Sequence, residues 1–184
     1  MNRALLLVDL QNDYFPGGRM ELVGAEAAVS SAVFVLKDFR EAAQQVVHVQ
    51  HISVQPGATF FLPGTVGASI HSDVAPLTGE RVFAKHFPNS FRDTGLHEYF
   101  QSLSISELVV CGMMTHMCVD TTVRAAFDLG YKVTLIPEAC ATRDLVYEGQ
   151  SIPADVVHGA YMAALGSVFA TLRRPDDGVL DSAR

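Results

Sequence analysis

Short apolar runs that alternate with stretches of helical periodicity constrain the fold of this chain more than any other feature. Five runs rich in Val, Leu and Ile lie at 4–9, 45–51, 81–85, 107–112 and 132–137. They are apolar along nearly their whole length, which is typical of parallel strands buried on both faces. Helical patterns lie at 25–42, 94–103, 116–129 and 153–166, and a short sixth strand is expected at 167–172. The sequence therefore predicts an α/β domain with a doubly wound parallel sheet and helices on both faces.

Length and charge limit the domain count and the partners. A chain of 184 residues fits one domain, which we place at 1–172, followed by a polar tail at 173–184. A net charge of −7 argues against nucleic acid and anionic membranes as partners. No apolar run is long enough to span a bilayer, and the 3 cysteines lack CxxC spacing. We therefore expect a cytoplasmic protein. The Gly/Pro-rich segment 53–80 is expected to be functional or interfacial.

Three chemically active side chains follow three of the apolar runs. Asp9 ends the first run, Lys85 ends the third, and Cys118 follows the fourth. The carboxyl ends of parallel strands share one edge of the sheet, and ligands bind there, near the point where the strand order reverses. We therefore expect a carboxylate, an ammonium and a thiol at one crevice.

Cys118 is the candidate nucleophile. The segment "MTHMCVDTTVRAAFDLG" predicts a helix capped by Thr115, which places Cys118 in its first turn. The free N–H groups and the dipole at that end are expected to lower the thiol pKa and could stabilise an oxyanion. The alternative is a small buried side chain, as most free cysteines are. Cys111 and Cys140 are expected to be structural.

Asp9 and Lys85 each have two interpretations. An acid that ends an apolar strand is costly to bury unless it is paired. Asp9 is thus either a loop-bonding carboxylate or a proton acceptor for the thiol that later protonates the leaving group. Lys85 is either an exposed residue at a strand end or the partner of Asp9. The occurrence of all three side chains at one edge favours catalysis.

The motifs of the chain resemble those of a known family. "LLLVDLQNDYF", "FAKHFPNSF" and "VVCGMMTHMCVDTTVRAAFDLGYKVTLIPEACAT" occur in this order and resemble the isochorismatase-like cysteine hydrolases over about residues 3 to 170. That family includes nicotinamidases, carbamoyl-amide hydrolases and streptothricin hydrolase. The resemblance implies the strand order 3-2-1-4-5-6 and a catalytic triad of Asp9, Lys85 and Cys118. It implies hydrolysis of an amide, carbamoyl or cyclic amide C–N bond of a small molecule through a thioester on Cys118, and no cofactor is expected.

The resemblance also implies roles for neighbouring residues. It implies a cis peptide bond between Met113 and Met114, with the backbone N–H groups of Met114 and Cys118 as the oxyanion hole. Tyr14 corresponds to an aromatic residue that lines the pocket. His116, two residues before Cys118, is expected to contact the substrate. A Cys–His pair with His116 as the general base is the rival arrangement.

Two departures from relatives narrow the expected activity. Metal-binding nicotinamidases carry an Asp-x-His pair after the second strand and a later histidine. Here His51 and Ser53 occupy the pair positions and Phe60 the later one, so we expect no metal, although His71 is available. His48 and His51 are expected to point to opposite faces of their strand. True isochorismatases lack the cysteine nucleophile, so its presence favours C–N cleavage over vinyl-ether cleavage.

Other functions and an assembly remain open at this stage. The alternatives are a catalytically inactive or regulatory small-molecule-binding α/β module, and a true isochorismatase-type vinyl-ether hydrolase. The first turn, "DLQNDYFPGG", lacks the G-x-G-x-x-G phosphate cradle of a nucleotide-binding module. Oligomers are common in the family, and a neighbour could cover the apolar segment 53–67. We therefore expect a homo-oligomer, a dimer or larger.

Overall fold

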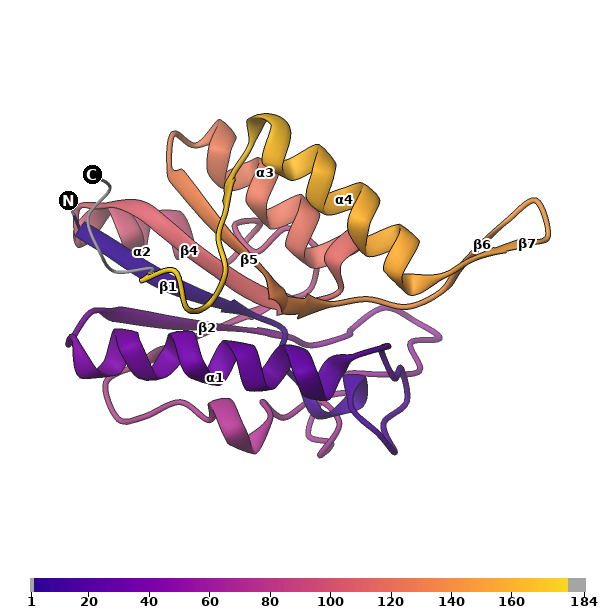
Figure 1. Ribbon diagram of the computed structural model, residues 1–184. Helices are drawn as coiled ribbons and strands as arrows, with labels where there is room; N and C mark the ends of the chain where they lie inside the picture. The colour runs from indigo at the N-terminus through magenta and orange to yellow at the C-terminus, as the bar shows by residue number, and fades with distance from the viewer. Residues whose placement is uncertain (1, 179–184) are drawn as a thin grey trace.

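Six parallel strands form the central sheet in the order β3-β2-β1-β4-β5-β8 (Figure 1). The computed structural model describes residues 2–178. The strands are β1 (Asn2–Val8), β2 (Gln45–His51), β3 (Arg81–Lys85), β4 (Ile105–Met113), β5 (Lys132–Ala141) and β8 (Thr171–Leu172). All five pairings are parallel. The predicted fold class and strand order are confirmed, with β8 as the sixth strand.

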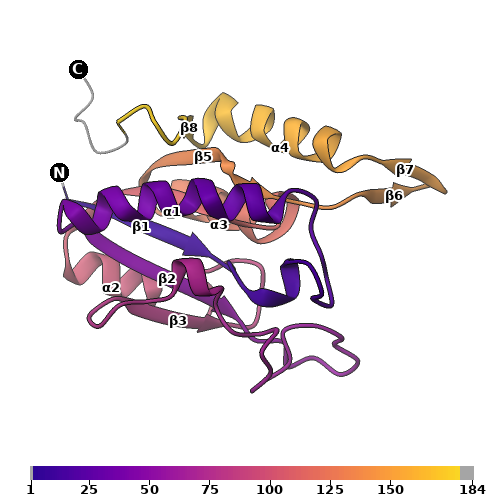
Figure 2. The same ribbon diagram turned by 60° about the horizontal axis from the view of Figure 1, so that its bottom comes forward.

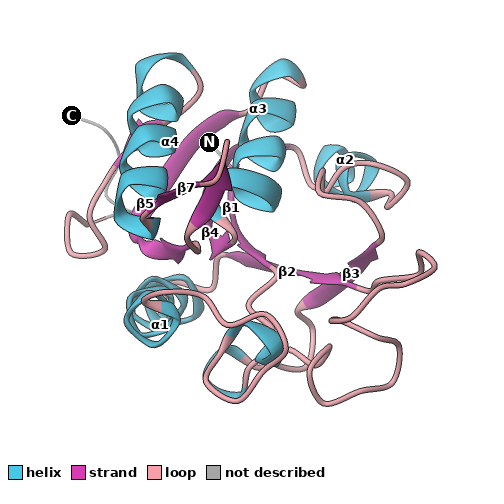
Figure 3. Ribbon diagram, turned by 90° about the vertical axis from the view of Figure 1, so that its right-hand side faces the viewer, coloured by secondary structure: helices cyan, strands magenta, loops and turns pink. Residues whose placement is uncertain are grey.

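Helices cover both faces of the sheet (Figure 3). They are α1 (Ala25–Glu41), α2 (Leu96–Ser102), α3 (Asp120–Asp128) and α4 (Ala154–Val168), with short helical turns η1 (Asn12–Tyr14), η2 (Ser72–Val74) and η3 (Thr115–Val119). Helix α1 lies on one face, and the other three lie on the opposite face (Figure 3). No helix in the described range 2–178 has the length and apolar character needed to cross a membrane.

A separate antiparallel hairpin interrupts the α/β alternation. Its strands are β6 (Leu145–Tyr147) and β7 (Gln150–Ile152). The hairpin projects from the body of the molecule between β5 and α4 (Figures 1 and 2). The strands β6 and β7 do not join the central sheet, whose sixth strand is therefore β8.

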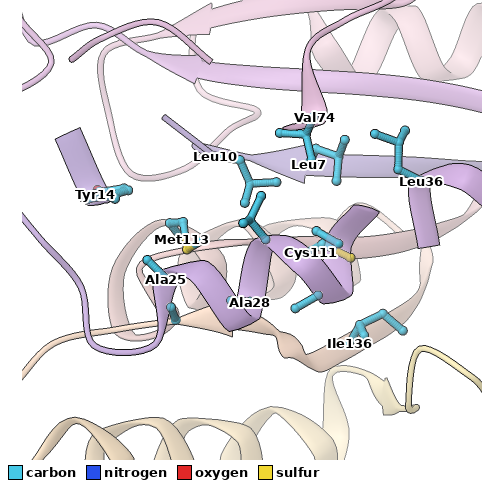
Figure 4. Packing of buried hydrophobic residues seen from close by; sticks show 14 of the residues in the cluster. Leu7, Leu10, Tyr14, Ala25, Ala28, Leu36, Val74, Cys111, Met113 and Ile136 are labelled. Atoms are coloured by element: carbon cyan, nitrogen blue, oxygen red, sulfur yellow. The ribbon is translucent and has the colours of Figure 1, made fainter. Parts of the chain in front are cut away.

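Apolar side chains fill both faces of the sheet, as the continuous apolar runs predict. Along β1, Leu5 and Leu7 pack on the α1 side, whereas Leu6 and Val8 pack on the side of the other helices. Figure 4 shows part of the α1-side core, with side chains from β1, β4 and β5 meeting those of α1. Full burial of such a side chain contributes about 1.5–3 kcal/mol. Packed apolar layers therefore fix the central strands from both faces of the sheet.

The observed boundaries differ from the expected ones at the C-terminal end. Helix α4 continues to Val168, so the sixth strand keeps only Thr171–Leu172 of the expected 167–172. The boundary between the domain and the polar tail at residue 173 stays a prediction, and its last part, 179–184, lies outside the described residues.

Candidate active site

Asp9 and Lys85 form a buried ion pair at the carboxyl ends of β1 and β3. Lys85 Nζ lies 2.8 Å from Asp9 Oδ2, and both side chains are 0% exposed. Strand β2 lies between β1 and β3, so the lysine side chain spans its width. Apart from this contact with Lys85, neither oxygen of Asp9 makes a hydrogen bond of regular geometry with residues 2–178. The carboxylate is thus charge-paired and still has lone pairs free to accept a proton.

The ammonium of Lys85 has more acceptors than protons. Besides contacting Asp9, Nζ donates to the carbonyl oxygens of Phe87 and Pro88, each at 3.1 Å, and lies 3.4 Å from His51 Nδ1. Burial alone would lower the pKa of Lys85, but the Asp9 carboxylate, with a further contribution from the neighbouring Cys118, outweighs it and the pKa is raised. Lys85 therefore stays protonated and supplies a full positive charge to the site.

Cys118 completes the cluster. Its Sγ, a carboxylate oxygen of Asp9 and a ring nitrogen of His51 all lie within 4.8 Å of one another. Burial raises the pKa of the Cys118 thiol far above its ordinary value, the Asp9 carboxylate raises it further, and Lys85 only partly offsets them. The expected lowering of the thiol pKa is therefore wrong. The sulfur carries its proton at rest, beside an acceptor for it.

The turn that carries Cys118 is the π-helix η3 and not the first turn of an α-helix capped by Thr115. The Thr115 hydroxyl lies 3.3 Å from the carbonyl oxygen of Ala141, to which it donates, and 3.0 Å from His158 Nδ1. It is thus bound to β5 and α4 and does not cap the turn, so the predicted cap is wrong. Such π-turns are frequent at functional sites because they displace a side chain from regular helix geometry.

The backbone before η3 also differs from the expectation. All peptide bonds among residues 2–178 are trans, so the expected cis bond between Met113 and Met114 is wrong. The chain leaves β4 through the backbone angles of Met114, φ 3° and ψ 104°. The N–H of Val119 then donates to the Met114 carbonyl at 3.3 Å and closes the turn. The role of the Met114 and Cys118 amides as an oxyanion hole stays a prediction.

Tyr14 lies buried beside the cluster. Burial is the main cause that raises the pKa of the Tyr14 hydroxyl well above its ordinary value, and the neighbouring Cys118 and Asp9 add to it. The ring packs edge-on against Phe61, with centroids 4.6 Å apart. Phe61 belongs to the segment 53–80, and its N–H donates to Asp13 Oδ2 at 2.6 Å. The long segment is thus fixed against the Tyr14 side of the site, and the contact of Tyr14 with substrate stays a prediction.

His116 lies apart from the ion pair. Its Nδ1 is 2.6 Å from the Thr142 hydroxyl, and its ring packs against Tyr161 with centroids 6.1 Å apart. We find no hydrogen bond between His116 and Cys118 in the described part of the chain. The acid beside the sulfur is Asp9, which disfavours the rival Cys–His pair. The expected substrate contact of His116 stays a prediction.

The histidines considered as metal ligands are dispersed. His48 and His51 point to opposite faces of β2, as predicted, because His48 Nε2 lies 2.9 Å from Glu80 and His51 faces Lys85. The ring of His71 packs against Phe15, with centroids 4.0 Å apart. The ligand pattern of metal-binding nicotinamidases is therefore not reproduced by these residues.

One other set of donors could hold a metal by distance alone. Asp9, His51 and Cys118 offer a carboxylate, an imidazole and a sulfur, which are groups that zinc binds. Lys85 already neutralises Asp9 and would repel a dication, which disfavours a metal at these three groups. The expectation of a metal-free site stays a prediction.

Sequence reasoning missed the support for the end of β2. The buried Gln11 side chain accepts from the N–H of His51 at 2.7 Å and donates to the carbonyls of His51 and Ala68, at 2.9 and 2.7 Å. This double contact fixes the backbone of His51 beside the ion pair. A polar residue two places after Asp9, at the end of an apolar strand, was the available signal.

The chain is similar to known proteins over most of its length. The Isochorismatase domain family matches residues 3–165. The isochorismatase family protein YddQ of Bacillus subtilis is 49% identical over 94% of this chain and 96% of its own length. A streptothricin hydrolase of Streptomyces noursei is 36% identical over 89% and 59%, and a nicotinamidase of Escherichia coli is 31% identical over 92% and 95%. The crystal structure of an isochorismatase from Pseudomonas putida has a TM-score of 0.88 at 36% identity and covers 95% of this chain and 88% of that chain. The chain therefore belongs to the isochorismatase family of hydrolases.

Proposed function

We propose that the protein is a cysteine hydrolase that cleaves the C–N bond of a small amide, carbamoyl or cyclic amide compound through a thioester on Cys118. The observation that carries the proposal is the meeting of the Asp9 carboxylate, the Lys85 ammonium and the Cys118 sulfur in one buried cluster. The names of two relatives, a streptothricin hydrolase and a nicotinamidase, support this reaction class.

Acylation uses Asp9 as a proton shuttle. As the Cys118 sulfur attacks the carbonyl carbon, its proton passes to Asp9, and the amides of Met114 and Cys118 bind the oxyanion. Protonated Asp9 then gives this proton to the leaving nitrogen as the C–N bond breaks. Asp9 returns to its ionised form beside Lys85, and Cys118 carries the acyl group. Water then hydrolyses the thioester and releases the acid.

The positive charge of Lys85 compensates the negative charge present in the site during these reaction steps. Without its charge, the buried cluster would carry one uncompensated negative charge, on Asp9 at rest and on the sulfur or the oxyanion once Asp9 holds the proton. The ammonium at 2.8 Å from Asp9 keeps the cluster neutral at both stages.

The test compares the wild type with Cys118→Ala on a panel of small amides, N-carbamoyl compounds and cyclic amides. We expect the variant to lose about 10³-fold or more in kcat/KM, because no other group replaces the nucleophile. With a slow substrate, intact-protein mass spectrometry should detect an acyl adduct on wild-type Cys118.

Cys140→Ala is the matched control. Cys140 is buried in β5, and burial raises the pKa of its thiol to about 12. Its removal should leave the rate of amide hydrolysis within a few-fold of the wild type. Undiminished hydrolysis by Cys118→Ala, or cleavage of vinyl ethers with no activity on amides, would contradict the proposal.

A further inference from the structure

The hydroxyl of Tyr14 is a buried polar group without a partner in the described part of the chain. The Tyr14 side chain is 2% exposed, yet its hydroxyl makes no hydrogen bond with any residue in the range 2–178. The buried hydroxyl of Tyr131, by contrast, lies 2.8 Å from His97 Nδ1. Burying a hydroxyl without a partner costs free energy that a phenylalanine in the same place would avoid. Packing alone therefore does not account for a tyrosine at this position.

This hydroxyl is not sealed from solvent. The side-chain polar atoms of residues 2–178 that are sealed from solvent and lack a regular hydrogen bond are the two oxygens of Asp9. The Tyr14 hydroxyl also lacks a hydrogen bond but is not one of these sealed atoms. The small accessible part of the side chain therefore includes the hydroxyl, while protein encloses the rest of the ring. A small molecule can reach the hydroxyl from outside.

Backbone and ring contacts fix the Tyr14 side chain. In η1, the N–H of Tyr14 donates to the Gln11 carbonyl at 3.1 Å, and its carbonyl accepts from the N–H of Leu22 at 3.0 Å. The ring packs edge-on against Phe61, with centroids 4.6 Å apart, and its centroid lies 6.1 Å from that of Phe60. The hydroxyl is therefore held in one position beside two phenylalanine rings.

Contacts lead from this ring to the candidate nucleophile. The ring of Phe61 also lies against His51, with centroids 5.9 Å apart, and a ring nitrogen of His51 lies within 4.8 Å of Cys118 Sγ. Figure 4 shows Tyr14 at the same end of the α1-side core as Met113, where β4 ends just before η3. Tyr14 therefore lies on the α1 side of the sheet, close to the turn that carries Cys118.

The acyl part of the substrate is the part nearer to this hydroxyl. Burial is the largest cause of the raised pKa of Tyr14, and Cys118 contributes more to it than Asp9 does. The hydroxyl thus keeps its proton at neutral pH and is a hydrogen-bond donor. In the proposed reaction the acyl part is bound to the Cys118 sulfur, whereas Asp9 gives its proton to the leaving nitrogen. A donor on the side of the sulfur therefore meets the acyl part.

We propose that Tyr14 is a specificity-determining residue whose hydroxyl donates a hydrogen bond to an acceptor atom in the acyl part of the substrate. The substrate class is then a small amide with an oxygen or nitrogen acceptor next to the scissile carbonyl group. A purely hydrocarbon acyl group would leave the hydroxyl unpaired and is selected against. This inference rests on the proposed function and narrows its substrate class.

The experiment compares p-nitrophenyl methoxyacetate with p-nitrophenyl butyrate, whose acyl chains have equal length and differ by one ether oxygen in place of a methylene. Both esters acylate a nucleophilic cysteine, and kcat/KM for p-nitrophenol release reports that step. We expect Tyr14→Phe to lower kcat/KM for the methoxyacetate about 5- to 10-fold, as for the loss of one hydrogen bond between neutral groups. The value for the butyrate should change less than about two-fold. Comparing each ester between wild type and variant cancels the difference in their intrinsic reactivity.

Tyr131→Phe is the matched control, because it removes a buried hydroxyl that has a partner in His97. It should lower the melting temperature and leave the ratio of the two kcat/KM values unchanged. Tyr14→Phe should keep the melting temperature of the wild type, since it breaks no hydrogen bond within the protein. An unchanged ratio in Tyr14→Phe, or an equal loss with both esters, would overturn the role of Tyr14. A wild type in which neither ester acylates Cys118, as seen by intact-protein mass spectrometry, would overturn the proposed function itself.

Discussion

Lys85 is a fully buried lysine, which is rare unless the charge is paired. Here a carboxylate and two backbone carbonyls surround its ammonium. Taking both charges out of water costs about as much as their attraction returns, so the intact pair adds little net stability. Its two members are nevertheless interdependent, since either one alone would be an unpaired buried charge.

Replacement of Lys85 by Met should therefore damage both activity and stability. Loss of the ammonium leaves Asp9 unpaired, and we expect the free energy of unfolding to fall by about 3–5 kcal/mol. Hydrolysis should be lost together with acetylation of Cys118. Stability is measured by urea denaturation, and acetylation by the release of p-nitrophenol from p-nitrophenyl acetate.

The double variant Asp9→Asn, Lys85→Met provides the control. It removes both charges, so it should recover much of the lost stability while staying inactive. Lys37→Met, at an exposed lysine of α1, should change neither property. A double variant as unstable as Lys85→Met would contradict the assignment of the loss to an orphaned carboxylate.

At the scale of elements, the contact between β1 and β4 positions Asp9 relative to the turn that carries Cys118. Val8 and Gly112 are register partners, one residue before Asp9 and six before Cys118. A Cβ on Gly112 would lie 2.2 Å from the Val8 carbonyl oxygen, and its φ is +154°. Only glycine lets the two strands approach this closely at the crevice.

Gly112→Ala should therefore push β1 and β4 apart. We expect destabilisation of about 1–3 kcal/mol, because the clash is with backbone, and a fall in kcat larger than the rise in KM. Gly159→Ala, in α4 with nothing within 4 Å of the new Cβ, should instead stabilise slightly. Thermal unfolding and amide hydrolysis of both variants would test this, and a Gly112→Ala protein with wild-type stability would contradict it.

The elements differ in how well the sequence predicts them. Continuous apolar runs predicted all five long strands, since burial on both faces leaves a clear pattern. The segment after β4 was predicted as a capped α-helix, and its first turn is instead the π-helix η3. Thr115 is bonded to β5 and α4, and no local pattern reveals partners that lie 26 and 43 residues away.

At the scale of the whole molecule, Glu80 joins α1, β2 and the start of β3. Its carboxylate accepts from Arg40 at 2.7 and 2.8 Å and from the N–H of Leu77 at 2.9 Å, and lies 2.9 Å from His48 Nε2. Burial would raise the pKa of Glu80, but these bonds outweigh it and lower the pKa to about 2. Edge strand β3, which carries Lys85, is thus fixed by a charged network at its beginning.

This network makes stability depend on pH in a defined window. The carboxyl pKa of Glu80 is lower when folded than its unfolded value of 4.5, so its contribution is complete above about pH 4.5 and is lost as pH falls toward 2. Glu80→Gln should lose about 1–2 kcal/mol near pH 7, after allowance for solvent screening. The difference from wild type should shrink on acidification, measured by urea denaturation at several pH values. Glu41→Gln, at an exposed residue, should show no such dependence, and a constant Glu80→Gln deficit would refute the assignment.

The sequence predicts which residues form the candidate site, but not their protonation or the contacts that fix their positions. Asp9, Lys85 and Cys118 follow buried strands, and the topology brings strand ends to one edge, so their convergence could be anticipated. The protonated thiol, the clamp by Gln11 and the position of His51 depend on distances across β1, β2 and η3 that no local pattern contains. The small-molecule partner, the homo-oligomer and the cytoplasmic location stay predictions.

The protonated resting state of Cys118 has a consequence for the life of the protein in a cell. Peroxides and other electrophiles modify thiolates far faster than thiols, and they need access to the sulfur. Burial raises the pKa of the Cys118 thiol, so the thiolate that they attack is scarce, and the side chain is only 5% exposed. Sulfenic acid formation on Cys118 should therefore be slow in the protein without substrate, which protects the candidate nucleophile from oxidative inactivation.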